Sequence, residues 1–281
     1  MGPSIELQAE VRNWWESNPM TYDWRNSISY QEGTRDFFEE IDERFWNAAW
    51  FAHQPGEQPF SRLIDYPDLK GKEVLEIGCG AGSLTAQLAI SGAKLTAIDL
   101  TEHATALSRR RFALTGLSGN ILQMDARNLK FSDESFDFVW SWGVIHHSAE
   151  MEKIISEIYR VLKPGGEARL MVYHRNSIWF RVNYVMIRGI LMGQLWRHTP
   201  QEIANKYSDG HIANFYTAAE LKTRCEPIFS QLKTEIYGQK VEIWPLPAGR
   251  LKNILVKLTP DALTGFLTRR FGGFLFVSAI K

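Results

Sequence analysis

The sequence predicts an α/β protein with a doubly wound, mostly parallel seven-stranded sheet, a helical N-terminal cap and an inserted helical lid. Short apolar segments alternate with helical segments between residues 72 and 173, the order of a parallel sheet covered on both faces. A glycine-rich turn, residues 78–82, follows the first apolar segment. Residues 1–70 show helical spacing and no strand pattern, so we expect a cap or lid preceding a domain of residues 71–281.

The composition is that of a globular protein without an obvious polyanionic partner. Of the 281 residues, 44% are hydrophobic and 23% are charged, which is sufficient for a full core. The 32 basic and 32 acidic residues cancel, whereas nucleic-acid-binding proteins usually carry a basic excess. We therefore expect no nucleic-acid partner.

The cysteines and the apolar stretches bear on the compartment. Cys79 and Cys225 are the two cysteines, and they form neither a metal-binding spacing nor a disulfide scaffold. The sequence shows no signal-peptide pattern and no apolar stretch long enough to span a bilayer. We therefore expect a cytoplasmic protein with no transmembrane segment and no metal site.

Helices are expected in the N-terminal cap. Phe37, Phe38, Ile41 and Phe45 recur at helical spacing, and prolines and a glycine at residues 55–59 break the chain. Tryptophan is concentrated in the first fifth of the sequence. These rings can pack in a core or form an aromatic lid over a small-molecule pocket. The residues concerned are Trp14, Trp15, Trp24, Trp46 and Trp50.

Strands and helices then alternate in order. The apolar patterns predict strands at residues 73–77, 94–100, 120–124, 136–141 and 168–173. The segments between them predict helices at residues 83–91, 101–115 and 150–162, the last ended by the Pro-Gly-Gly turn at residues 164–166.

The C-terminal third predicts two more strands separated by helical insertions. Strands are expected at residues 229–237 and 274–280, and a helix capped by Thr217 at residues 217–225. The insertions cover about residues 176–215 and 244–270. The amphipathic segment 178–196 can line an acceptor pocket, lie on a membrane surface or simply cover the sheet. Because apolar residues surround most of this segment, we favour burial in a lid.

The turn after the first strand is the natural seat for a cofactor, because ligands of open α/β sheets bind beyond the carboxyl ends of the strands. Its glycines run G-x-G-x-G, and Ser83 stands where a dinucleotide site has its third glycine. Glu76 precedes the turn. A carboxylate there would repel a pyrophosphate but attract a cationic aminoacyl-sulfonium ligand. The sign of this charge favours S-adenosylmethionine over NAD.

Two further acids end neighbouring strands. Asp99 follows the turn by about twenty residues and can accept both ribose hydroxyls. Asp125 ends the third strand, within reach of an adenine amino group. The alternatives are that Asp99 caps the helix from Thr101 and that Asp125 is a loop acid. Cys79 is interpreted as a small filler of the tight turn.

These segments together resemble class I S-adenosylmethionine-dependent methyltransferases. The run from Val74 to Gly82 looks like their first motif, Met124-Asp125-Ala126 resembles their adenine-side motif, and residues 135–139 and 158–166 resemble the segments around strands four and five. The resemblance covers about residues 74–173 and implies a Rossmann-like domain. The cofactor contacts that it implies are Glu76, Gly78, Cys79, Gly80, Gly82, Asp99, Leu100, Asp125, Ala126 and Trp142.

The end of strand four bears on the methyl acceptor. Residues 140–147 lack the motifs of base-, arginine- and catechol-methylating enzymes and resemble a small-molecule branch of the superfamily. His146 or His147 can act as a general base there or can pack the loop. Substrate contacts are expected from outside the core, at Tyr22, Trp24, His174, Tyr207 and His211.

The leading hypothesis is methyl transfer to oxygen, nitrogen or carbon of a small hydrophobic or aromatic metabolite, with S-adenosylhomocysteine as product. One alternative is a lipid or quinone methyltransferase at a membrane. The other is a catalytically silent, methyltransferase-like binding protein, although the intact Glu76, Asp99 and Asp125 argue for cofactor binding.

Overall fold

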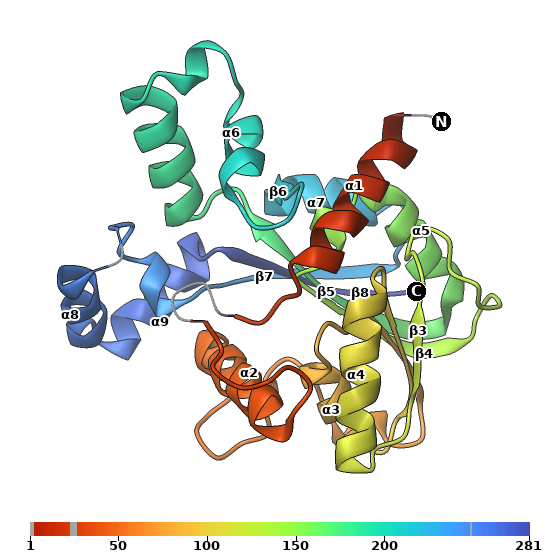
Figure 1. The fold of residues 1–281 in the computed structure, drawn as a ribbon. Helices are drawn as coiled ribbons and strands as arrows, with labels where there is room; N and C mark the ends of the chain where they lie inside the picture. The colour runs from red at the N-terminus through yellow and green to blue at the C-terminus, as the bar shows by residue number, and fades with distance from the viewer. Residues whose placement is uncertain (1–2, 23–26, 248) are drawn as a thin grey trace.

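The computed structural model describes residues 3–22, 27–247 and 249–281. One mixed sheet runs through the molecule in the order β3-β2-β1-β4-β5-β8-β7, with β6 paired to β5 (Figure 1). The strands are β1 (Glu73–Ile77), β2 (Lys94–Asp99), β3 (Asn120–Gln123), β4 (Phe136–Trp142), β5 (Leu162–His174), β6 (Phe215–Tyr216), β7 (Gln231–Tyr237) and β8 (Phe274–Ile280).

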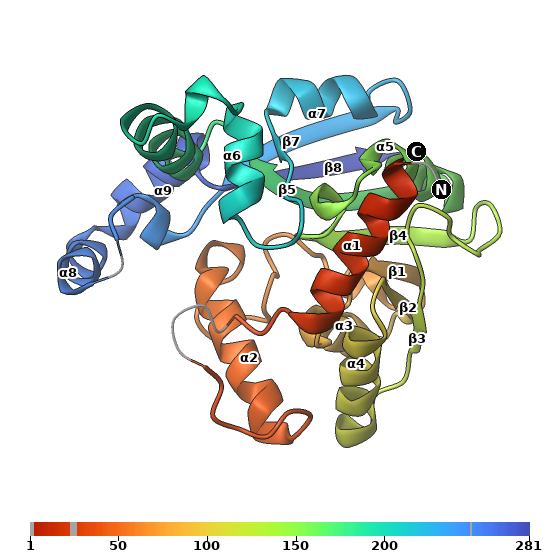
Figure 2. The same cartoon turned by 45° about the horizontal axis from the view of Figure 1, so that its top comes forward.

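Helices lie on both sides of the sheet (Figure 2). The α-helices are α1 (Pro3–Ser17), α2 (Arg35–Ala48), α3 (Ser83–Ile90), α4 (Glu102–Thr115), α5 (Met151–Val161), α6 (Pro200–Tyr207), α7 (Ala218–Cys225), α8 (Arg250–Leu258) and α9 (Asp261–Phe271). Short 3₁₀ turns are η1 (Trp50–Ala52), η2 (Pro67–Leu69), η3 (Ile145–His147), η5 (Gln194–Trp196) and η6 (Lys240–Glu242), and η4 (Phe180–Leu191) is a π-helix.

The sheet confirms the predicted fold class and corrects its details. All pairs from β3 to β5 are parallel, and β8 is antiparallel between β5 and β7. Seven strands were expected; the eighth, β6, is a two-residue strand too short to leave a pattern in the sequence. Strand β5 begins six residues before the expected start, because Leu162 already pairs with Phe136 before the register shifts.

The strand order reverses between β1 and β4, which places a crevice at their carboxyl ends. On one face, α5 and α7 bury Ile154, Ile158 and Leu221 against the sheet. On the other, α3 and α4 pack with the aromatic rings of Phe60 and Trp140. Both rings are fully buried, so part of the aromatic excess belongs to the core. This packing fixes the strand ends from which the site is built.

The N-terminal region is helical, as predicted. Helix α1 crosses the carboxyl ends of the strands, and α2 lies beside α3 and α4 (Figures 1 and 2). The Glu16 carboxylate accepts hydrogen bonds from the backbone N–H groups of Glu102 (3.0 Å) and His103 (2.9 Å), at the start of α4. Those N–H groups have no partner within their own helix, so the carboxylate fastens the end of α1.

The insertion after β5 forms η4, η5 and α6. Phe180 and Tyr184 of η4 pack against α6 and Phe215, while the far end of η4 projects from the body of the molecule. Within the described ranges, no helix is long and apolar enough to cross a bilayer.

Candidate functional site

A large pocket opens at the carboxyl ends of β1, β2 and β4, under α1. It encloses about 1530 Å³, its open mouth included. Eleven of the residues expected to bind cofactor or substrate, or to act as base, line it. They are Tyr22, Glu76, Gly78, Cys79, Gly80, Asp99, Leu100, Asp125, Ala126, Trp142 and His147.

The other expected site residues that the structure describes lie elsewhere. Gly82 supports the pocket from behind as the N-cap of α3. His146 is fully buried behind His147, and Tyr207 lies under the Arg188 guanidinium, 4.1 Å from its ring centroid. His211 pairs with Glu10 of α1 at 3.1 Å. Trp24 lies outside the described residues.

Two glycines of the turn after β1 are required by its shape. Gly78 has a φ of +87°, and a Cβ there would lie 2.1 Å from a methyl group of Val144. Gly80 has a φ of +52°, and a Cβ on it would project into open space. Its backbone therefore borders the pocket without a side chain, as close approach of a ligand requires.

Asp99 organises the turn. One carboxylate oxygen accepts from the Gly80 N–H at 3.1 Å, and the other accepts from the N–H (3.0 Å) and hydroxyl (2.9 Å) of Thr101. Thr101, and not Asp99, is the N-cap of α4. Burial raises the pKa of Asp99, and the hydrogen bonds oppose that rise. A carboxylate has about four acceptor positions, so capacity remains for ligand hydroxyls.

Glu76 is a buried carboxyl group with one unpaired oxygen among the described residues. Its side chain is 3% exposed, and among the described residues its Oε2 has no hydrogen-bond partner. Burial raises the pKa of Glu76 to about 8; the nearby Thr85 hydroxyl opposes this rise, and the charge of Asp99 adds to it. A buried carboxyl oxygen without a partner is costly unless a ligand supplies one. The arrangement therefore fits a ligand with an ammonium group near Glu76 and vicinal hydroxyls near Asp99.

Asp125 is held by a partner that the sequence did not predict. The Arg127 guanidinium donates to both carboxylate oxygens of Asp125, with contacts of 2.8–3.2 Å, and to Glu150 at 2.7 Å. Arg127 follows Asp125 by two positions, which is the only local signal for this pairing. The pair fixes Asp125 at the rim of the pocket beside Ala126.

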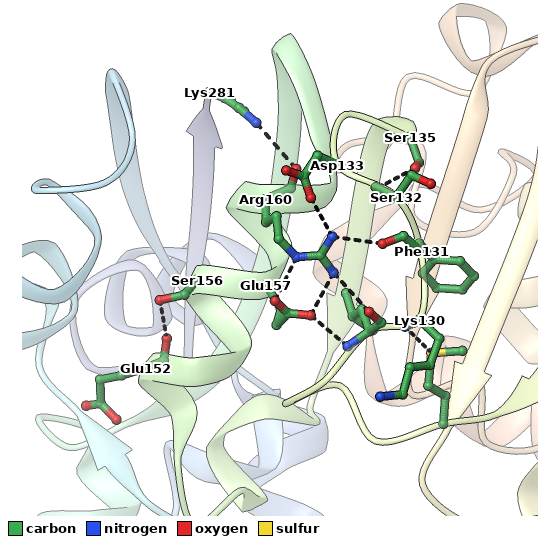
Figure 3. Close-up of polar contacts among 12 residues, drawn as sticks. Lys130, Phe131, Ser132, Asp133, Ser135, Glu152, Ser156, Glu157, Arg160 and Lys281 are labelled. Atoms are coloured by element: carbon green, nitrogen blue, oxygen red, sulfur yellow. Dashed lines mark hydrogen bonds and ion pairs between the residues drawn. The ribbon is translucent and has the colours of Figure 1, made fainter.

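The loop between β3 and β4, which carries Asp125, is fastened from below (Figure 3). Arg160 of α5 forms a two-pronged contact with Glu157 at 2.8 Å for each prong and donates to Asp133 at 2.8 Å. It also donates to the carbonyl oxygens of Leu129 and Phe131. Glu157 in turn accepts from the Leu129 N–H at 2.7 Å. Loop and helix are thus one unit beneath the pocket.

His147 has a defined tautomer. Its Nδ1 lies 2.6 Å from the carbonyl oxygen of Ile212, which can only accept, so Nδ1 carries the proton. Its Nε2 is buried and has no hydrogen-bond partner within the described chain. Burial lowers the pKa of His147, so the ring is neutral near neutral pH. His147 contributes to the pocket lining, and its Nε2 carries a lone pair in place of a proton.

Tyr173 lies in this part of the pocket wall and is held by Asp209. The Tyr173 hydroxyl donates to an Asp209 carboxylate oxygen at 2.8 Å, and its ring lies 4.0 Å from that of His146. Tyr173 lines the pocket, whereas the next residue, His174, bonds through Nδ1 to the Gly272 carbonyl at 2.9 Å. Neighbouring side chains of a strand face opposite ways, and this separates the two.

Helix α1 covers the pocket, with a predominantly apolar lining. The amide oxygen of Gln8 accepts from the Ala149 N–H at 3.2 Å, and the Trp15 ring stands edge-on to His147 at 5.0 Å. None of residues 178–196, expected as a lid, contributes to the pocket lining. The large apolar side chains of the wall are Val11, Trp15, Met20, Tyr22, Phe45, Trp142, Met171 and Phe274.

Comparison with known proteins relates this chain to methyltransferases. A family model described as a methyltransferase domain matches residues 75–170. Phthiotriol/phenolphthiotriol dimycocerosates methyltransferase 1 of Mycobacterium ulcerans is 37% identical over 204 residues, 72% of this chain and 73% of that protein. A ubiquinone biosynthesis O-methyltransferase of Pseudomonas syringae is 33% identical over 143 residues, 50% of this chain and 62% of that protein.

The extent of these matches varies. The chain spans 40% of the length of the phthiotriol/phenolphthiotriol dimycocerosates methyltransferase of Mycobacterium tuberculosis, at 37% identity over 38% of its own length. An S-adenosylmethionine-dependent methyltransferase from Mesorhizobium loti has a TM-score of 0.54 at 17% identity, with coverage of 81% of this chain and 99% of that one. The predicted fold and the predicted cofactor, S-adenosylmethionine, are confirmed. The chain belongs to the class I S-adenosylmethionine-dependent methyltransferases.

Proposed function

We propose that this chain transfers a methyl group from S-adenosylmethionine to a lipophilic small molecule, with His147 as the general base. The observation that carries the proposal is the state of His147. Its Nδ1 proton is committed to Ile212, and its buried Nε2 has no partner in the described structure. A lone pair held in this way in a pocket wall is suited to removing a proton from an acceptor.

The cofactor fits the carboxyl ends of β1, β2 and β3. Glu76 binds the amino group, Asp99 binds the ribose hydroxyls, and Asp125 and Ala126 border the adenine. The Gly78–Gly80 backbone allows the close approach that this placement needs. When bound, S-adenosylmethionine supplies an electrophilic methyl group on a sulfonium centre. The chain contributes alignment and exclusion of water, which are the main requirements of such a displacement.

The acceptor side of the pocket is apolar. Trp15, Tyr22 and Phe45 from the N-terminal region line the same pocket as Trp142 and Phe274 from the sheet. The Tyr22 ring stacks on Phe45 with centroids 4.7 Å apart, which adds to a flat aromatic surface. The relatives named for dimycocerosates and for ubiquinone biosynthesis support an apolar acceptor. We therefore place the acceptor in the lipid- or quinone-like range of small molecules.

The test uses methyl-labelled S-adenosylmethionine with separate organic and aqueous extracts of the source cells. Wild-type protein should label a compound in the organic extract. The variant His147→Asn keeps an N–H donor near the Nδ1 position for Ile212 and removes Nε2, so it should retain cofactor affinity and lose about 10²–10⁴-fold in turnover. Labelling confined to the aqueous extract would contradict the apolar acceptor. Undiminished turnover in His147→Asn would contradict the base.

A further inference from the structure

Exposed apolar side chains are concentrated in the two helical insertions. Fourteen large hydrophobic residues of the described structure are exposed, and eleven of them lie on or beside η4, η5, α8 and α9. Scattered exposed apolar residues are ordinary on a protein surface, but a concentration of this kind marks an interaction site. The eleven are Met186, Ile190, Leu191, Met192, Leu195, Trp196, Leu251, Ile254, Leu258, Leu263 and Phe266.

Helices α8 and α9 expose apolar side chains and bury polar ones, the reverse of an ordinary surface helix. Leu251, Ile254 and Leu258 recur at spacings of three and four and are 54–72% exposed. The buried residues of the two helices are Lys252, Thr264 and Thr268. An amphipathic helix normally buries its apolar stripe, so this orientation favours an apolar environment outside the molecule.

The end of η4 and the turn η5 present a second apolar group. Leu191 is 73% exposed and Trp196 is 91% exposed, the highest value among the exposed large hydrophobic residues. Gly193, with a φ of +70°, turns the chain between them. Tryptophan is enriched where proteins meet the interface between water and lipid, because its ring is apolar and its N–H is polar.

The two apolar groups lie on one side of the molecule. In both ribbon views, η4 and the α8–α9 pair project from the end of the sheet opposite β3. They are also linked at their bases, because the Lys252 ammonium lies 5.2 Å from the ring centroid of Trp179, next to η4. The insertions therefore form one extended face, which we call the insertion face.

The insertion face is strongly basic in a chain of zero net charge. Residues 176–201 and 250–271 contain eight Lys or Arg residues and a single acidic residue, Asp261. Asp261 is already paired with Lys240 at 2.8 Å. Arg197, Lys257, Arg269 and Arg270 are exposed around the apolar side chains. Long basic side chains beside apolar ones suit an anionic lipid surface, with apolar groups among the acyl chains and charges at the headgroups.

We propose that the insertion face is a docking surface for an anionic lipid bilayer. Each Lys or Arg near such a surface adds to the attraction between the protein and the anionic headgroups. In a symmetric dimer, a second copy of this chain would bring two basic insertion faces together, and their repulsion disfavours that occupant. The proposal goes beyond the proposed function and does not depend on it, because binding to vesicles requires no turnover.

The experiment is co-sedimentation of the full chain with lipid vesicles. The protein should pellet with phosphatidylcholine vesicles that contain phosphatidylglycerol and remain in the supernatant with pure phosphatidylcholine. High salt should release the protein, because salt screens the attraction between the basic residues of the insertion face and the headgroups. The tryptophan emission should shift to shorter wavelength on binding, since Trp196 would leave water.

Matched variants separate the face from the rest of the surface. Leu191→Ser with Trp196→Ser, and separately Arg197→Glu with Arg269→Glu, should each weaken binding by at least about tenfold. The control variants are Ile90→Ser, a 59% exposed apolar residue on α3, and Lys70→Glu, an exposed basic residue on the body. Both controls should bind as the wild type does.

Three outcomes would overturn the proposal. These are no pelleting with anionic vesicles, equal pelleting with neutral ones, and equal loss of binding in the control variants. Light scattering tests the other occupant, a second copy of this chain. A dimer that Leu191→Ser with Trp196→Ser dissociates, together with no vesicle binding, would assign the face to a second copy of the chain.

Discussion

The residue whose environment has the sharpest consequence is Glu76. Its pKa of about 8 means that it is mostly protonated near neutral pH before a ligand binds. An ammonium group placed beside it favours the carboxylate and lowers that pKa. We therefore predict that binding of S-adenosylhomocysteine near pH 7 releases close to one proton. Calorimetry in buffers of different ionisation enthalpy measures this number directly.

The matched control is Glu76→Gln, which has no proton to release. It should bind more weakly, with a binding enthalpy that no longer depends on the buffer through this group. Equal proton release in wild type and Glu76→Gln would assign the titration to another group and contradict the placement of the ammonium beside Glu76.

The same shift predicts the pH dependence of stability without ligand. The folded pKa of Glu76, about 8, lies above the unfolded value of about 4.3, so folding takes up a proton between these values. The stabilisation is complete below the unfolded pKa and is lost as pH rises through the folded one. Wild-type protein should therefore lose thermal stability relative to Glu76→Gln between about pH 5 and pH 8. Parallel melting curves for the two proteins across that range would contradict the shift.

Asp99 gives a second prediction at this scale. Asp99→Ala removes the carboxylate assigned to the ribose hydroxyls and also its bonds to Gly80 and Thr101. Affinity for S-adenosylhomocysteine should fall by about 1–3 kcal/mol, the range for hydrogen bonds to a charged group. Thr101→Val serves as the control, because it removes the bonds of the Thr101 hydroxyl to Asp99 and to the Ala104 N–H but leaves the Asp99 carboxylate in place. If Asp99→Ala binds as tightly as wild type, the ribose assignment is lost.

The site residues that the sequence predicted are placed by local structure, whereas those that it missed are placed by contacts between distant parts of the chain. Glu76 and Asp99 stand at fixed positions relative to strand ends, so period and spacing were sufficient to bring them together. The pairing of Tyr173 with Asp209 joins residues 36 positions apart, and it depends on how a loop returns to the sheet. Sequence patterns report local geometry, and a contact of this kind depends on the tertiary fold.

At the scale of elements, α1 covers the pocket, and Glu16 ties its C-terminal end to the start of α4. Removing that carboxylate leaves the N–H groups of Glu102 and His103 without their cap. We predict that Glu16→Ala speeds hydrogen exchange in α1 by roughly two- to thirtyfold, the equivalent of a lost cap of 0.5–2 kcal/mol. Binding of S-adenosylhomocysteine should slow exchange in α1 of the wild type.

The control for the Glu16 variant is Glu10→Gln on the same helix. Glu10 pairs with His211, but both side chains are well exposed, at 59% and 39%, so the loss should be small. Equal effects of the two variants would mean that α1 is held by its apolar contacts alone. Unchanged exchange in α1 on ligand binding would remove the gating role and leave the family assignment unaffected.

Two apolar helical segments outside the sheet, α1 and residues 178–196, also show where prediction from sequence fails. Both α1 and residues 178–196 are rich in apolar residues, and both lie outside the sheet in the sequence. The structure brings only α1 over the pocket, while η4 packs its inner side on α6 and exposes its end. An amphipathic pattern specifies which side of a helix prefers an apolar environment. It does not specify whether a pocket or another surface provides that environment.

At the scale of the molecule, the balanced charge conceals an uneven distribution. The sequence has equal numbers of basic and acidic residues, so the chain as a whole has no basic excess. The fold nevertheless brings two basic insertions, separated by about fifty residues in the sequence, to the same end of the sheet. Net charge is a sum over the chain and retains no information about this placement, which depends on the order of the strands.

The last prediction concerns whether the α8–α9 insertion is part of the folding unit. Tyr237 and Phe274 are direct partners in the antiparallel β7–β8 ladder, so a two-residue turn can close the hairpin. We predict that replacing residues 238–273 with Asn-Gly leaves a cooperatively folding protein.

The loss in stability should be modest. The excision removes the hydrogen bonds of His174 to the carbonyl groups of Gly272 and Gly273, at about 1 kcal/mol each. With smaller losses in packing against β7, Tm should fall by roughly 4–12 °C. Affinity for S-adenosylhomocysteine should change by less than about threefold, because the cofactor residues lie at the ends of β1, β2 and β3, outside the excised segment. Loss of the cooperative transition would show that the insertion belongs to the core of the fold, and loss of binding with folding intact would extend the cofactor site to Gln239, which lines the pocket.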